Sequence, residues 1–394
     1  MITLAIVLYG CKKCNLNCLY CNPHDVLEAA DSTQFKLDKA KLATTIETYP
    51  KYQAELENGI QNPQITFEIW GGNPLLHKKE FRETVEFLEF QYPHCTINTT
   101  DNCFSLADND TVEYIIQHNI GVQLSHDGYG QWLRSGNFDP LQDEKINSNI
   151  IKLVNLGLIT AINCVLNRAN CSPFKNIEYF NKWRWKNNIE NQNLFIKLNH
   201  IMNEECHIDK INTFGNWQDK IDESRKGKEI GDLHFYGNEL SQFISEYTQL
   251  GIYFRKNDFN NLSLYFKPFA EFVLDMTKNY RILTADDLEY GACSMFQRGY
   301  KSHNFAIDTT GDFCQCDLVE SDVHVKNPKG NRPSYCKDCK FSDMTVCQCC
   351  GAYKFPKECN FNKAMAQMES MFYTIDTGKF LFSNVDFNLK NVLN

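Results

Sequence analysis

The sequence predicts an α/β protein, in the form of a partial (β/α)6 barrel followed by a small cysteine-rich domain. Over the first two hundred residues, short β-branched runs alternate with amphipathic stretches, which indicates repeated βαβ units around a parallel sheet. Nine of the eighteen cysteines lie between Cys293 and Cys359. That segment has little hydrophobic periodicity, so it would need metal to hold it together.

The barrel is expected to contain six strands separated by helices. The strand candidates are Thr3–Leu8, Gln64–Trp70, Thr96–Thr99, Gly121–Ser125, Thr160–Leu166 and Phe195–His200. The helix candidates between them are Leu37–Thr48, Lys78–Gln91, Asp110–His118, Ile146–Leu156 and Pro173–Trp185. In such folds the functional loops lie at the carboxyl ends of the strands.

Changes in composition divide the chain into four regions. Residues 1–202 are expected to form the barrel core, and residues 203–287 a connecting or inserted region with helices at Asn238–Leu250 and Leu264–Met276. Residues 288–362 are expected to form the cysteine-rich domain. Residues 363–394 would form a C-terminal helix and tail.

Composition and charge exclude several classes of protein. The net charge of −9 argues against a general binder of nucleic acid or anionic membrane, which usually carries a basic face. No stretch reaches the roughly 20 apolar residues of a membrane span. The opening ten residues lack the basic start and cleavage region of a signal peptide, so a cytoplasmic protein is expected.

In a reducing compartment, many cysteines indicate metal or cluster ligands rather than disulfides. Four of the eighteen fall within Cys11–Cys21. Five are scattered, and these are expected to be small buried hydrophobic residues. They are Cys95, Cys103, Cys164, Cys171 and Cys206.

Cys14, Cys18 and Cys21 form a C-x3-C-x2-C pattern directly after the first strand. A short loop with this spacing can place three thiolates at three corners of a cubane cluster. The fourth iron would then have an open coordination position, as catalytic metal centres do. The alternative is a zinc loop that uses three of the four cysteines Cys11, Cys14, Cys18 and Cys21, although zinc sites usually show two separated C-x2-C pairs.

This pattern resembles the hallmark of the radical S-adenosylmethionine (AdoMet) superfamily, and Tyr20 before the last cysteine also fits it. The resemblance implies a [4Fe-4S] cluster whose open iron is chelated by the amine and carboxylate of AdoMet. It further implies reductive cleavage of AdoMet to methionine and a 5′-deoxyadenosyl radical. The protein would supply position and shielding to this cofactor.

Two further motifs fall in the order expected of that superfamily. Gly71-Gly72-Asn73-Pro74 after the second strand looks like its G-G-E-P element, with Asn73 in place of the usual glutamate, and would meet the methionine amino group. Ser125-His126-Asp127-Gly128 after the fourth strand resembles S-x-D-G, where Ser125 and Asp127 would face the ribose and the substrate. Both motifs could also be simple turns. Asn163 and Asn167 would lie near the nucleoside, or could be structural.

The C-terminal cysteines resemble the SPASM domain, which holds two auxiliary [4Fe-4S] clusters in enzymes that modify peptides. The resemblance implies one cluster on Cys293, Cys316 and Cys350, with Cys314 as a fourth ligand, and a second on Cys336, Cys339, Cys347 and Cys359. The inner spacings depart from the usual pattern, and Cys349 is an additional thiol. A zinc site on the two C-x2-C pairs, or a single auxiliary cluster, remains an alternative.

Asp317 directly follows Cys316. In the anaerobic sulfatase-maturating enzymes a Cys-Asp pair supplies an aspartate proposed to accept a proton, so Asp317 is a candidate catalytic residue; it could equally be a turn aspartate.

The resemblance implies a maturase that takes hydrogen from a peptide or protein, giving an oxidation or a crosslink, with a flavodoxin or ferredoxin as electron donor. The rival hypotheses are a radical enzyme that dehydrogenates a small molecule and a zinc-stabilised scaffold without enzymatic activity.

Overall fold

A computed structural model describes about half of the chain. The described residues are 2–7, 14–16, 18, 37–189, 194–200, 238–239, 241–243, 245–246, 249 and 304–314. All structural statements below concern these residues. The predicted region 363–394 and nearly all of the cysteine-rich region 288–362 lie outside them.

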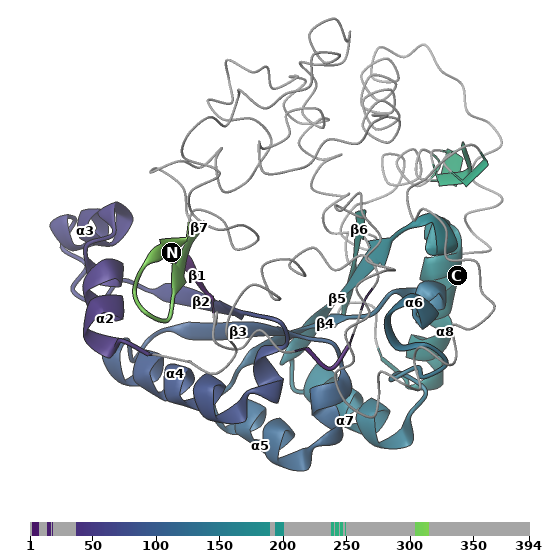
Figure 1. Cartoon of the computed structure of the whole chain (residues 1–394), viewed down its shortest axis with the longest axis horizontal. Coiled ribbons are helices and arrows are strands. Elements are labelled where there is room, and N and C mark those ends of the chain that lie inside the picture. The colour runs from purple at the N-terminus through teal and green to yellow at the C-terminus, as the bar shows by residue number, and fades with distance from the viewer. Residues whose placement is uncertain are drawn as a thin grey trace, which may run out of the picture.

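The described part is an α/β structure in which each barrel strand but the last is followed by helices (Figure 1). The strands are β1 (Ile2–Val7), β2 (Ile65–Trp70), β3 (Thr96–Asp101), β4 (Gly121–Ser125), β5 (Ile159–Leu166), β6 (Phe195–His200), β7 (Asn304–Asp308) and β8 (Phe313–Cys314). The α-helices are α2 (Lys39–Glu47), α3 (Pro50–Glu57), α4 (Lys78–Gln91), α5 (Asn109–Gln117), α6 (Trp132–Ser135), α7 (Glu144–Asn155) and α8 (Pro173–Lys186). Short 3₁₀ turns are η1 (Pro74–Leu76), η2 (Phe104–Ala107), η3 (Gly128–Gly130) and η4 (Arg168–Asn170).

The strands form one open sheet in the order β6-β5-β4-β3-β2-β1-β7-β8. Strands β1 to β6 pair in parallel with their neighbours, β7 pairs in parallel with β1, and β8 returns antiparallel to β7. Among the described strands, the two edges of the sheet do not pair with each other, so the barrel is incomplete. The predicted partial (β/α)6 barrel is therefore confirmed.

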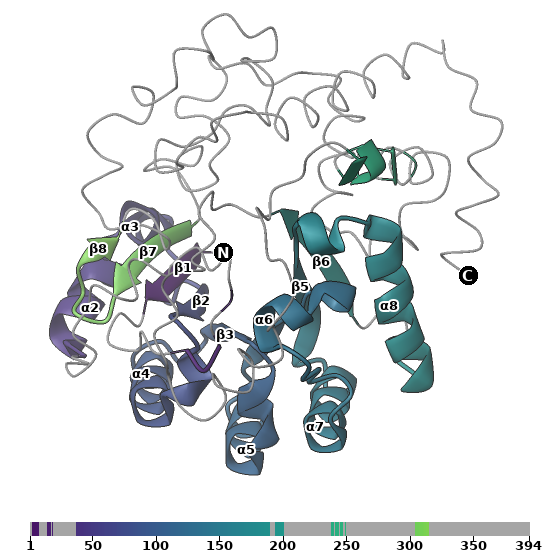
Figure 2. The same ribbon diagram turned by 45° about the vertical axis from the view of Figure 1, so that its right-hand side comes forward.

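The core lies between the sheet and the helices α4, α5, α7 and α8, which cover one face (Figure 2). Along β2 the side chains alternate, with Ile65, Phe67 and Ile69 fully buried towards the helices. The opposite face of the sheet carries half-buried polar residues, such as Gln123 on β4 and Asn163 on β5. The side of the sheet that the helices do not cover is therefore polar.

Four of the described α-helices begin at a capping side chain. Asp38, Asp108, Asp143 and Ser172 each accept a hydrogen bond from a backbone N–H in the first turn of α2, α5, α7 and α8 respectively. Such caps satisfy donors that have no partner within the helix. None of the described helices is long and apolar enough to cross a membrane.

The six predicted strands and five predicted helices of the barrel all form, with boundaries shifted by at most two residues. Helix α3 and strands β7 and β8 were not anticipated. Strand β7 comes from the region assigned to the cysteine-rich domain, yet it extends the barrel sheet beside β1. In the predicted connecting region, the described residues between positions 238 and 249 are helical.

The turn between β7 and β8 packs on α2 and joins distant parts of the chain. Thr45 Oγ1 donates to the carbonyl oxygen of Gly311 at 2.7 Å, and the backbone N–H of Asp38 donates to the carbonyl oxygen of Thr309 at 2.9 Å. Lys41 forms an ion pair with Asp312. These contacts attach the first described helix to the last described strands.

Candidate functional site

The functional motifs converge because β1 to β5 are parallel and therefore end at one edge of the sheet. The loop after β1 contributes Cys14 and Cys18, and the loop after β2 contributes Gly71–Pro74. Asn102 follows β3, and Ser125–Gly128 ends β4 and enters the next turn. Four loops thus supply polar side chains to the same edge.

Cys14 and Cys18 belong to a small cluster of apolar side chains at this edge. Cys18 is buried with Leu16, Phe104 and Leu133, and half-buried Cys14 packs against them. Burial raises the pKa of Cys14 to about 11, and neighbouring Cys18 contributes to this increase. The backbone N–H of Leu16, 3.5 Å from the sulfur of Cys14, acts in the opposite direction. The two thiols are therefore adjacent, and Cys18 is buried while Cys14 is half-buried.

Cys21, the third predicted ligand, and Tyr20, the predicted aromatic position, lie outside the described residues. Within the described ranges, no three His, Cys, Asp or Glu side chains form a metal site. Cys103, Cys164 and Cys171 are buried and Cys95 is partly buried. The prediction of buried cysteines is therefore confirmed for Cys103, Cys164 and Cys171, whereas Cys95 is partly buried against the core; Cys206 is not described.

The Gly71–Pro74 loop is linked to Cys14 by hydrogen bonds that pass through the side chain of Asn102. Asn73, 1% exposed, donates its Nδ2–H to Asn102 Oδ1 at 2.9 Å and to Ser105 Oγ at 3.2 Å. Asn102 in turn donates to the sulfur of Cys14 at 3.4 Å and to Asn15 Oδ1 at 2.6 Å. The element that was expected to contact AdoMet is thus hydrogen-bonded to the cysteine loop.

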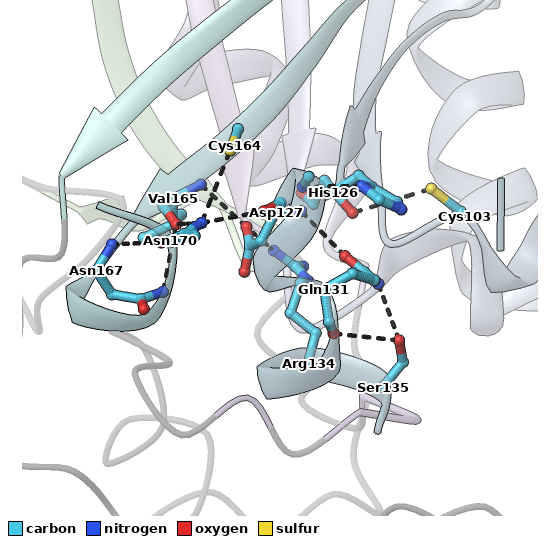
Figure 3. Close-up of polar contacts among 12 residues, drawn as sticks. Cys103, His126, Asp127, Gln131, Arg134, Ser135, Cys164, Val165, Asn167 and Asn170 are labelled. Carbon is cyan, nitrogen blue, oxygen red and sulfur yellow. Dashed lines mark hydrogen bonds and ion pairs between the residues drawn. The ribbon is translucent and has the colours of Figure 1, made fainter. Parts of the chain in front are cut away.

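Asp127 is fully buried and joins β4, β5 and α6 (Figure 3). Its Oδ1 accepts from the backbone N–H of Val165 at 3.0 Å and from Arg134 Nη1 at 3.4 Å. Burial raises the pKa of Asp127 to about 6, although Arg134 acts to lower it. Its contacts are internal, so Asp127 would influence a ligand through Arg134 and the β4 loop.

Arg134 carries positive charge towards the cysteines. Its guanidinium lies near enough to Cys14 to lower the pKa of that thiol, and the thiols of Cys14 and Cys18 raise the pKa of the arginine. Its side chain is only 10% exposed, so its charge is poorly screened by water. Anionic thiolates or an anionic ligand at this edge would be stabilised.

Ser125 and Asn163 are neighbours on β4 and β5, paired in register on the half-buried polar face. Asn163 donates to Gln123 Oε1 at 3.3 Å. Asn167 is buried, and its Oδ1 accepts from the backbone N–H of Ala169 at 2.9 Å, which caps η4. Ser125 and Asn163 thus lie side by side on the polar face of the sheet, whereas Asn167 caps the turn that follows β5.

Gly128 completes the β4 motif for a steric reason. Its φ is +58°, and an added Cβ would collide with the side-chain oxygen of Asn176. Only glycine fits both the conformation and the space.

The structure does not describe the remaining predicted site residues. These are Asp317 and the auxiliary ligands Cys293, Cys316, Cys336, Cys339, Cys347, Cys350 and Cys359, all outside the described residues. Of Cys314, which ends β8, the structure describes only the backbone, and it pairs with Ala306 of β7.

Three residues at this edge of the sheet were not predicted from the sequence. Asp101 ends β3 and Asn102 follows it, and their position at a strand terminus was the available signal. Arg134 lies on a short helix, and nothing local in the sequence indicates that it approaches the cysteines.

The chain matches no protein-family model and no curated protein. It does match solved structures. A histidine-tagged form of anSMEcpe with bound AdoMet is 16% identical, with a TM-score of 0.57 over 95% of this chain and 97% of that chain. Native anSMEcpe with bound AdoMet and the Cp18Cys peptide is 14% identical, with a TM-score of 0.54 over 95% and 97%. This chain therefore shares the fold of these anSMEcpe structures.

Proposed function

We propose that this chain is a radical AdoMet enzyme that abstracts hydrogen from a peptide or protein substrate. Cys14, Cys18 and Cys21 would hold a [4Fe-4S] cluster, and the bound cluster with AdoMet would supply a 5′-deoxyadenosyl radical. The observation that carries the proposal is the juxtaposition of Cys14 and Cys18 with Arg134 and Asn102 at the carboxyl edge of this barrel.

The residues present fit a thiolate-ligated cluster. One buried and one half-buried thiol lie together, and soft sulfur ligands suit iron–sulfur centres. The cation of Arg134 and the amide of Asn102 would offset the negative charge that the thiolates acquire. The rings of Phe104 and Phe138, whose centroids are 5.1 Å apart, pack in the apolar cluster beside the two cysteines and would exclude water from that side. Water exclusion would protect a reactive radical.

AdoMet would lie over the loops that end β2 and β4. Backbone groups of Gly71–Pro74 would meet its methionine part, and Ser125 and Asn163 would face its nucleoside from the polar side of the sheet. Asp127 would hold Arg134 and the turn at Gly128 in place. Tyr20 would complete this binding site.

A peptide or protein substrate is proposed because anSMEcpe, which shares the fold, is known with a bound peptide. The cysteines of region 288–362 would hold auxiliary clusters that accept an electron, and Asp317 would accept the accompanying proton. A flavodoxin or ferredoxin would supply electrons to the barrel cluster.

The test measures iron, sulfide and zinc in anaerobically purified protein and in a C14A/C18A/C21A variant. About 12 iron atoms, falling to about 8 in the variant, are expected from three four-iron clusters. A Cys95→Ala variant, which removes a core thiol, should keep the wild-type iron content. Stoichiometric zinc with little iron after anaerobic reconstitution would overturn the proposal and favour a zinc-stabilised scaffold.

Turnover separates the remaining hypotheses. Reduced protein supplied with AdoMet should form 5′-deoxyadenosine, and the triple variant should form none. A cysteine-containing peptide should then increase this product and itself lose hydrogen. Product that increases only with a small alcohol would instead favour dehydrogenation of a small molecule.

A further inference from the structure

The side-chain amide of Asn102 offers an N–H to the sulfur of Cys14. The Nδ2–Sγ distance is 3.4 Å, and Asn102 is only 5% exposed. The same amide nitrogen also donates to Asn15 Oδ1, within the cysteine loop. The cysteine loop is thus attached to the end of β3 by one asparagine.

The surrounding protein determines the orientation of this amide. Its Oδ1 accepts from Asn73 Nδ2 at 2.9 Å and from the backbone N–H of Phe104 at 3.2 Å. A flipped amide would direct its own hydrogens at these two donors. The NH2 group must therefore face Cys14, whether or not a cluster is bound.

We propose that Asn102 is a positioning residue that raises the reduction potential of the cluster held by Cys14, an inference that rests on the proposed function. A reduced cluster carries one more negative charge than an oxidised one. An N–H donor aimed at a ligand sulfur stabilises the reduced state more, since hydrogen bonds to cluster sulfurs set the potential. The low exposure of Asn102 strengthens this effect because water cannot replace the bond.

The contact with Asn102 accounts for the asparagine at position 73, where the G-G-E-P element has glutamate. The Nδ2–H of Asn73 is one of the two donors that orient Asn102. An ionised glutamate has no N–H to donate and would bring a carboxylate close to Asn102 Oδ1. Asparagine at position 73 is therefore suited to an asparagine at position 102.

The test is an EPR-monitored redox titration of the reconstituted, full-length protein. The cluster at Cys14 is identified as the one whose signal changes on addition of AdoMet. Asn102→Asp keeps an oxygen that can accept from Asn73 and Phe104, but it replaces the NH2 group that donates to Cys14 with a second carboxylate oxygen. Asn102→Leu removes the NH2 group without adding charge. The matched control is Asn147→Asp on α7, whose amide also donates to Asn187 and accepts from Trp183.

Both substitutions at position 102 should make the cluster harder to reduce. The expected change is roughly tenfold in the reduction equilibrium, or about 59 mV towards negative potential for a one-electron couple. Asn102→Asp should show the larger shift, and Asn147→Asp none. Asn73→Glu leaves Asn102 in place and should shift the potential in the same direction, which keeps the test decisive if either position-102 variant fails to assemble its cluster.

The outcomes separate the two proposals. A wild type that holds no iron after reconstitution overturns both the proposed function and this inference. A loaded wild type whose potential is matched by every loaded variant at positions 102 and 73 overturns the inference alone.

Discussion

Asp101, at the end of β3, is a buried carboxylate with an unusual pKa. It is 1% exposed, and no donor among the described residues reaches its oxygens with full hydrogen-bond geometry. Burial raises its pKa to about 6, while the nearby groups of Ser105 and Asn73 act to lower it. Between about pH 4 and 6 the folded chain therefore retains a proton that the unfolded chain has released. Stability from this residue is present at low pH and is lost as the pH rises through 6.

An Asp101→Asn variant should remove this dependence. Relative to the wild type, the metal-free variant is expected to gain stability as the pH rises from 4 to 8, by on the order of 3 kcal/mol in total. Thermal unfolding of both proteins across that pH range measures the difference in their stability. The contributions of all other titrating groups cancel in this difference. Parallel curves would show that Asp101 titrates normally in the folded chain.

The buried pair of Asp127 and Arg134 should be fragile when only one partner is removed. Arg134→Met leaves the carboxylate of Asp127 buried without its cation, which typically costs about 3 kcal/mol. The double variant D127N/R134M removes both charges and should recover much of that loss. Chemical denaturation of the metal-free single and double variants measures the coupling. Additive losses would mean that the 3.4 Å contact contributes nothing.

At the residue scale, the sequence located the loops of the site better than its long-range contacts. The turn at Gly128 could be found because its positive φ and its close neighbour Asn176 restrict the position to glycine. The loop Gly71–Pro74 could be found because it directly follows a predicted strand. The approach of Arg134 to the cysteines could not, since it depends on the path of the chain between α6 and the loop after β1. The link from Asn73 to Cys14 likewise passes through Asn102, a residue from a third loop.

At the element scale, hydrophobic patterning was sufficient for β1 to β6 and for the helices between them. Buried parallel strands are apolar and β-branched, and their helices have one apolar face. Strands β7 and β8 are short and lie in a cysteine-rich stretch of sequence, so no period is visible there. Strand β7 pairs with β1, some 300 residues away in sequence, and β8 pairs only with β7. The non-local pairing of β7 leaves no local signal in the sequence.

The turn between β7 and β8 should be sensitive to a single methyl group. Gly311 has φ +81°, and an added Cβ would lie 2.7 Å from the backbone nitrogen of Leu42 on α2. Gly311→Ala is expected to lose about 1–3 kcal/mol from conformational strain and to weaken the contact with α2. Gly157→Ala is the control, because Gly157 has φ +73° but open space around its Cα. Equal thermal shifts in the two variants would indicate strain alone and no clash.

At the scale of the whole molecule, the sheet joins segments from opposite ends of the described chain. Strand β1 lies between β2 and β7, so the loop that carries Cys14 follows a strand held on both sides. Lys41, Thr45 and Asp38 add contacts from α2 to the β7–β8 turn. The predicted barrel region 1–202 therefore lacks a strand that supports its own cluster loop.

A chain cut after residue 202 should consequently be unstable or self-associating. Removal of β7 exposes the edge of β1, whose unpaired backbone groups would favour pairing with another chain. The loss of β7 should also expose Ile6 of β1, which pairs with β7 and is fully buried in the intact core. A chain cut after residue 315 keeps β7 and β8 and serves as the control. Size-exclusion chromatography and thermal unfolding compare the two; a monomeric 1–202 fragment that unfolds cooperatively at the temperature of the control would show that the barrel ends before β7.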